Sequence, residues 1–200
     1  MPYPSKITRQ TVIDAALALV EGEGPEALTL RRLAGDVGVT ANALYRYFDS
    51  RDDLLAASAD AVGQQLGMAI ANGMSELPSD VTAETRVRKL LTVYSDFAES
   101  NPALYRTFLS PKHDAGAKLP EPRFHELLWD QCLAIIEPLV GPKDAPVATV
   151  SIWGLLHGIW TLRQAGVLGG KKPVEIDGYA FDVMIRGLAV KSSGKYRTDD

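Results

Sequence analysis

The apolar residues of this chain recur at three- and four-residue spacing over most of its length. Proline and glycine divide this pattern into separate segments, and few β-branched alternating runs are present that would suggest a sheet. The pattern therefore predicts an all-α protein. Helices are expected over about residues 8–21, 29–37, 40–48, 50–75, 83–100, 102–109, 123–140, 147–165 and 175–190.

The long helix expected over residues 50–75 predicts how the chain is organised. We expect a domain boundary inside it, with three short helices before it and a larger helical domain after it. The predicted parts are an N-terminal three-helix domain over residues 1–55, a C-terminal helical domain over residues 56–191 and a flexible polar tail over residues 192–200. A hydrophobic fraction of 46% and a charged fraction of 23% are those of an ordinary soluble globular protein, so a chain of this length buries a real core.

Charge and cysteine content narrow the classes of function. A net charge of -4 argues against indiscriminate nucleic-acid binding, which favours a broadly basic chain. The single cysteine, Cys132, excludes an internal disulfide framework and a multi-cysteine metal site, which fits a reducing cytoplasm. No apolar run approaches the roughly 18 residues of a membrane span, and the N-terminus MPYPSKITRQ lacks the apolar core of a secretory signal. We therefore expect a cytoplasmic protein with no membrane partner.

The helices expected over residues 29–37 and 40–48 are separated by a tight turn around Gly38. Thr29 and Thr40 are predicted to N-cap these two helices, and Ser50 to N-cap the next one. This spacing matches a helix-turn-helix, in which the second helix enters the major groove of DNA. Leu44 and Phe48, four residues apart, are expected on the buried side of that helix. The alternative is an exposed helix whose tyrosines cover a domain edge.

The segment TANALYRYFDSRDDLL, from Thr40 to Leu55, interleaves aromatic, hydroxyl and basic side chains. Phosphates beside a major groove are bound by hydroxyl groups at helix N-termini and by longer phenol and guanidinium groups. The candidates for phosphate contacts are Thr29, Thr40, Tyr45, Tyr47 and Arg51. The candidates for base contacts are Asn42 for adenine, Arg46 or Arg31 for guanine, and Ala41 or Ala43 for a thymine methyl group.

Overall charge does not support this interpretation by itself, because residues 1–55 hold six Lys and Arg against eight Asp and Glu, which gives -2. Four of the acids belong to the first helix and the loop after it, whereas Arg31, Arg46 and Arg51 lie where a duplex would lie. The local potential can therefore differ from the sum.

Residues Thr8 to Leu55 resemble the DNA-binding domain of the tetracycline-repressor (TetR) family of bacterial transcription regulators. The motifs that carry the resemblance are VIDAALALVEGEG, ALTLRRLAGDVGV and TANALYRYFDSRDDLL, in the family's order and spacing. The resemblance implies DNA contacts at Thr29, Thr40, Tyr45, Tyr47 and Arg51. Arg51 departs from the family, which usually has lysine there. Arginine keeps the charge but offers a forked donor, so we expect the phosphate contact to survive with altered geometry.

The resemblance also implies a C-terminal domain that pairs two subunits through its last two helices and holds a ligand cavity between the others. Small residues at three- and four-residue spacing along the expected helix 147–165 would let another helix approach closely. The predicted interface residues are Ser151, Gly154, Gly158, Thr161, Ala165, Ala180, Val183 and Met184. The alternative for the small residues is a contact within one chain.

The segment IWGLLHGIW, together with NPALYRTFL upstream, resembles the tryptophan-histidine-glycine type of C-terminal domain in the same family. Trp153, His157 and Trp160 share one helical face, where His157 could orient a ligand in a cavity. The alternative is a satisfied core histidine. The predicted ligand-binding residues are Tyr94, Phe97, Phe108, Trp129, Trp153 and His157.

The sequence gives little support for an enzyme. His113, His125 and His157 lie on an expected loop and two different helices, and no pair has the spacing that puts two metal ligands on one helix face. The sequence has no glycine-rich phosphate loop after a strand and no nucleophile elbow. We therefore expect neither an enzyme nor a metal or cofactor site.

These observations predict a homodimeric transcriptional regulator that binds a palindromic double-stranded DNA operator. Repression, and release by a small-molecule effector, are expected by analogy with the family. The alternative is a helical interaction module or ligand sensor that no longer binds DNA.

Overall fold

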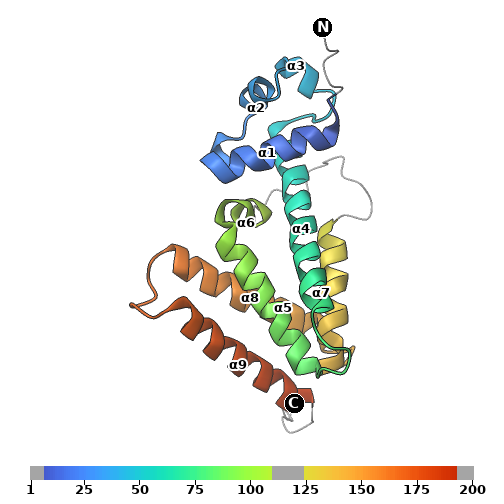
Figure 1. Ribbon diagram of the computed structural model, residues 1–200, viewed down its shortest axis with the longest axis vertical. Helices are drawn as coiled ribbons and strands as arrows, with labels where there is room; N and C mark the ends of the chain where they lie inside the picture. Colours follow the sequence, from blue (N-terminus) through green and yellow to red (C-terminus); the bar gives the residue numbers. More distant parts are fainter. Residues whose placement is uncertain (1–6, 110–123, 193–200) are drawn as a thin grey trace, which may run out of the picture. The chain divides into compact units, whose positions relative to one another are not determined.

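The computed structural model describes residues 7–109 and 124–192, and every regular element within those ranges is helical (Figure 1). The predicted all-α fold is confirmed. The elements are α1 (Arg9–Glu23), the 3-10 turn η1 (Pro25–Ala27), α2 (Leu30–Asp36), α3 (Ala41–Leu44), α4 (Arg51–Ser75), α5 (Ala83–Ser100), α6 (Pro102–Phe108), α7 (Phe124–Val140), α8 (Ala145–Gln164) and α9 (Pro173–Ser192). The flexible tail predicted over residues 192–200 lies outside the described residues except for Ser192, the last residue of α9, and the loop that carries His113 lies outside them as well.

Short polar side chains begin two of the predicted helices. The hydroxyl of Thr29 accepts the backbone N–H of Arg32 at the start of α2 (3.1 Å), and Ser50 accepts that of Asp53 at the start of α4 (3.0 Å). Both predicted N-caps are confirmed. The N-cap predicted at Thr40 is wrong in its chemistry, because Thr40 precedes α3 but its side chain makes no capping hydrogen bond.

The second helix of the helix-turn-helix is shorter than the predicted 40–48. Regular α-helix ends at Leu44, whose carbonyl accepts hydrogen bonds from the N–H groups of both Tyr47 (2.9 Å) and Phe48 (3.1 Å). The chain therefore tightens into an i→i+3 turn and still brings Phe48 back to the core, where it is fully buried. Leu44 is also fully buried, as predicted.

The chain divides into two compact units. The first comprises residues 1–65 and 101–126, and the second comprises residues 66–100 and 127–200. Helix α4 contributes its first part to one unit and its last part to the other, while α6 belongs to the first unit.

In the first unit, α1 packs against α2, η1 and α6. Val12, Ala16 and Val20, spaced by four residues, are fully buried along one side of α1. Leu28 and Leu33, also fully buried, bring the η1 and α2 segments into the same core. This core is the support on which α3 and the start of α4 are placed.

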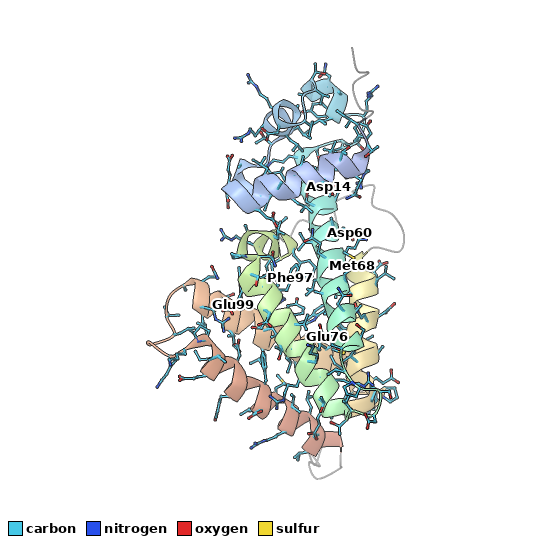
Figure 2. The ribbon with its side chains drawn as sticks, viewed as in Figure 1. Asp14, Asp60, Met68, Glu76, Phe97 and Glu99 are labelled. Atoms are coloured by element: carbon cyan, nitrogen blue, oxygen red, sulfur yellow. The ribbon has the colours of Figure 1, made fainter. Side chains whose placement is uncertain are left out.

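In the second unit, α5 packs against α8 and α9, and these two helices pack on each other. Apolar residues form the core between them, and a polar cluster centred on Arg163 of α8 adds to it. The Arg163 guanidinium pairs with Asp177 of α9 (2.8 Å) and with Glu99 of α5, which is labelled in Figure 2. Ser95 of α5 donates to the other oxygen of Asp177 (3.0 Å). The cluster ties three helices together at a side chain that is only 11% exposed.

Helix α8 corrects one expectation from the sequence. Residues 145–164 are long and apolar enough to cross a membrane by length and composition alone, although no such run was expected. The inner side of α8 is buried against α5 and α9, as in the core helix of a soluble protein. Four residues of α8, Val147, Ala148, Ser151 and Leu155, line part of the groove described below.

Candidate nucleic-acid interface and effector site

The turn between α2 and α3 is closed by backbone hydrogen bonds. Gly38 has a φ of 73°, a left-handed conformation that favours glycine. Its N–H donates to Gly35 (3.3 Å), and the N–H of Val39 donates to Ala34 (2.8 Å). This is the Schellman pattern of a helix C-terminus, and it sets the angle at which the chain enters α3.

The side chains of α3 and the following turn sort cleanly between core and surface. Leu44 and Phe48 are fully buried, whereas Asn42, Arg46 and Tyr45 are exposed, Tyr45 to 52%. The remaining predicted contact residues of this segment are exposed Thr40 and half-buried Ala41, Ala43 and Tyr47. Of the predicted base-contacting residues of this segment, Asn42 and Arg46 are thus accessible to a ligand.

Two neighbouring arginines at the start of α2 differ in their surroundings. Arg32 pairs with Glu23 (2.6 Å) and Asp36 (3.2 Å), and these hydrogen bonds, Glu23 first, raise the pKa of the guanidinium. Arg31 is exposed and makes no hydrogen bond or ion pair among the described residues. Arg31, the residue predicted from the sequence, is therefore the one available to a ligand.

Tyr47 and Arg51, both predicted phosphate contacts, are bonded to the protein's own backbone. The Tyr47 hydroxyl donates to the carbonyl of Ile7 (2.6 Å). Arg51 donates from Nε to the carbonyl of Leu28 (2.7 Å) and from Nη2 to that of Pro25 (3.2 Å). Sequence spacing gave no signal for these bonds, because the partners lie 23 to 40 residues apart.

The candidate effector residues of the second unit form two aromatic pairs. The ring of Tyr94 (α5) meets His157 (α8) at a centroid distance of 6.2 Å and an angle of 69°. Trp129 (α7) meets Trp153 (α8) at 5.4 Å and 74°. Both are edge-to-face arrangements. Phe97, half-buried on α5, is labelled in Figure 2.

Burial shifts the pKa values of two side chains in this region. Desolvation lowers the pKa of His157, which favours a neutral imidazole. Desolvation also raises the pKa of the buried Cys132 thiol to about 12, against a smaller lowering effect of a hydrogen bond from Trp153. The region therefore holds uncharged polar groups among aromatic rings.

The predicted effector residues are divided between the two compact units. Phe108 belongs to α6 in the first unit, where its ring lies 6.3 Å from that of Tyr105. The predicted set within the second unit is therefore Tyr94, Phe97, Trp129, Trp153 and His157.

A groove of about 550 Å³ runs between α8 and α9. Four of the predicted interface residues, Ser151, Ala180, Val183 and Met184, line it. Gly154, Gly158 and Thr161 of α8, and Ala165 just after it, are exposed but do not line the groove. Sequence reasoning missed the other eight lining residues, among them Val147 and Tyr179, which are 66% and 76% exposed. Their exposure depends on how α8 and α9 pack, which periodicity alone does not give.

An N-terminal helix-turn-helix with a polar and basic outer surface, joined to a larger helical unit with an aromatic cluster, defines a DNA-binding regulator of transcription. Residues 12–58 match the bacterial regulatory proteins of the tetR family, and residues 87–188 match the tetracyclin repressor-like C-terminal domain. The chain belongs to the tetracycline repressor family. The proteins of this family are transcriptional regulators and not enzymes. The finer resemblance to the tryptophan-histidine-glycine type stays a prediction.

Individual proteins show how far the similarity extends. The HTH-type transcriptional regulator BetI of Pectobacterium carotovorum is 28% identical over 168 residues, which cover 80% of this chain and 83% of that protein. A protein of unknown function from Rhodococcus sp. RHA1 is 29% identical, with a TM-score of 0.77 over 94% of this chain and 99% of that chain. A TetR variant from Acinetobacter baumannii, solved in complex with minocycline, has a TM-score of 0.68 at 23% identity over 94% and 99% of the two chains. At that identity the likeness shows the fold alone.

Proposed function

We propose that this regulator is a cytoplasmic homodimeric repressor that binds a palindromic operator and leaves it when a small molecule enters the second unit. The observation that supports DNA binding is the division of the side chains around α3 into buried and exposed ones. Leu44 and Phe48 anchor the segment in the core, and Asn42, Tyr45 and Arg46 face outward. A segment held this way can present amide, phenol and guanidinium groups to a major groove.

The contacts follow from the donors that each group has available. Asn42 suits adenine and Arg46 or Arg31 suits guanine, while Ala41 and Ala43 suit thymine methyl groups. The oxygen of Thr29 accepts the Arg32 N–H as an N-cap, which leaves its hydroxyl hydrogen to donate to a phosphate. Thr40 and Tyr45 are the other proposed phosphate contacts, since both are exposed.

A second copy of this chain is the proposed occupant of the α8–α9 groove. Apolar side chains dominate its lining, and Val183 at its edge is 54% exposed. Gly154 and Gly158 do not line the groove but suit a second copy packed against α8, because a Cβ added at either position meets nothing within 4 Å in this chain. Glycine inside a helix lowers stability by roughly 0.5–1 kcal/mol relative to alanine. Close approach of a second helix would explain why glycine is present at both positions.

The proposed effector is an uncharged, largely aromatic compound that contacts the two aromatic pairs of the second unit. Tyr94, Trp129 and Trp153 offer ring surfaces for stacking. A neutral His157 carries no charge to attract an anion. The effector would weaken DNA binding only if it has different affinities for the two states of the protein.

The test is selection of duplexes from a random pool by the purified protein, repeated across a salt series. A two-fold symmetric site with steeply salt-dependent affinity is the expected result, since released counterions dominate the binding of phosphates. Asn42→Ala should relax preference at particular base pairs of that site. Recovery of no enriched site, with affinity insensitive to salt, would favour the interaction module instead.

A further inference from the structure

Arg51 is the first residue of α4, and two of its nitrogens reach backward to the connection before α2. Nε donates to the carbonyl of Leu28 at 2.7 Å, and Nη2 donates to the carbonyl of Pro25 at 3.2 Å. Leu28 is fully buried, so the segment that supplies these carbonyls is fixed in the core. The two bonds therefore link the first turn of α4 to a rigid part of the first unit.

The Leu28 carbonyl lies just before α2, and the Pro25 carbonyl belongs to the first residue of η1. Thr29 follows Leu28, and its hydroxyl and carbonyl accept the N–H groups of Arg32 (3.1 Å) and Leu33 (3.0 Å). Arg51 thus holds the residues that set where α2 begins. Both bonds come from one edge of the guanidinium plane, a parallel arrangement that a single ammonium group cannot reproduce.

We propose that Arg51 is a positioning residue for DNA recognition, which acts through Thr29 and α2 and does not serve as a phosphate ligand. The proposal rests on the proposed function, because it assigns a role within DNA binding. It also replaces the phosphate contact expected from the sequence. The forked group of an arginine bridges two carbonyls in a fixed orientation, which the single ammonium group of a lysine would not.

Salt dependence separates positioning from phosphate contact. A cation that contacts a phosphate releases a counterion, so its removal lowers the slope of log affinity against log salt by about one. A positioning residue lowers affinity without changing that slope. Arg51→Lys keeps the charge and loses the fork, whereas Arg51→Met loses both. Arg106→Met, on the exposed surface of α6 in the same unit, controls for the loss of one positive charge.

The experiment measures affinity of the four proteins, including wild type, for the selected operator at five salt concentrations. Amide hydrogen exchange of the free proteins is measured in parallel. Both Arg51 variants should bind about tenfold more weakly, as expected for the loss of hydrogen bonds from a charged donor, with the wild-type slope. Exchange should accelerate at Arg32 and Leu33 and stay unchanged in α5 and α8. Arg106→Met should bind as wild type.

Three results would overturn the proposal. The first is wild-type affinity of Arg51→Lys together with a reduced slope of Arg51→Met, which identifies a phosphate contact. The second is unchanged exchange at Arg32 and Leu33. The third is faster exchange throughout both units, which would make Arg51 a support of the whole fold. If the wild-type protein selects no site, the proposed function fails, while the exchange measurement still decides whether Arg51 holds the start of α2.

Discussion

Gly73 of α4 marks a close approach of two helices in the second unit. A Cβ at this position would lie 2.7 Å from Cγ2 of Val93 and 3.1 Å from Cε of Lys89, both on α5. The lysine carbon is near the flexible end of its side chain and can move away. The valine carbon belongs to a β-branched side chain with a restricted χ1 angle, so relief requires a shift of the helices. Gly73→Ala is therefore expected to destabilise the second unit.

Two opposing effects determine how much stability the Gly73→Ala variant loses. Overpacking of this kind costs typically about 1–3 kcal/mol, and the change from glycine to alanine inside a helix returns up to about 1 kcal/mol. Because Gly73 is close to the end of α4 at Ser75, the helical gain is expected to be smaller than that. The net loss for Gly73→Ala is about 1–2 kcal/mol.

Urea unfolding at one fixed protein concentration measures this loss, since self-association makes stability depend on concentration. Val93→Ala and the double variant complete a double-mutant cycle. Truncation of Val93 makes room for the new methyl group, so the double variant should recover about 1 kcal/mol or more relative to additivity. Gly22→Ala, where the new Cβ meets nothing within 4 Å, serves as the control and should be neutral or slightly stabilising. Additive effects in the cycle would refute the predicted clash.

Three further outcomes are expected. Burial lowers the pKa of His157 in the folded protein from its ordinary value of 6.5. The unfolded chain therefore binds more protons than the folded one at pH values between 6.5 and the lower folded-state pKa, and the free energy of unfolding should fall as the pH drops through that range. His157→Gln should reduce that fall in urea titrations, and an identical fall in the variant would contradict the assignment. Gly158→Leu should leave the helical content unchanged but weaken self-association by at least about tenfold in sedimentation experiments; an unchanged dimer would exclude this surface. Tyr47→Phe removes the bond to Ile7 and should cost about 1 kcal/mol of stability, with DNA affinity reduced alike for all sequences.

The features that sequence reasoning predicted correctly depend on neighbouring residues. The N-caps at Thr29 and Ser50 need only a short polar side chain three residues before a free N–H. The turn at Gly38 needs a residue that tolerates a positive φ. Such signals lie within a few consecutive residues, so they can be recognised without knowledge of the fold.

The features that were missed depend on distant parts of the chain. Helix α3 ends at Leu44 although Leu44 and Phe48 are both buried, and no local residue breaks the helix there. The partners of Tyr47 and Arg51 are backbone carbonyls of earlier segments, whose positions follow from the packing of α1 and η1. A phenol or guanidinium has the same sequence signature whether it binds a phosphate or a carbonyl, since both acceptors are oxygens.

The contacts of Arg51 bear on how an effector could change DNA binding. If Arg51 holds the start of α2 to the first turn of α4, the helix-turn-helix and that turn move as one body. A displacement of α4 would then reorient the whole recognition surface and would leave its internal geometry, and so its base preference, intact. Effector binding should therefore weaken the affinity for every operator variant by the same factor. A change of base preference on effector binding would mean instead that the link at Arg51 breaks, and that α2 and α3 rearrange within the first unit.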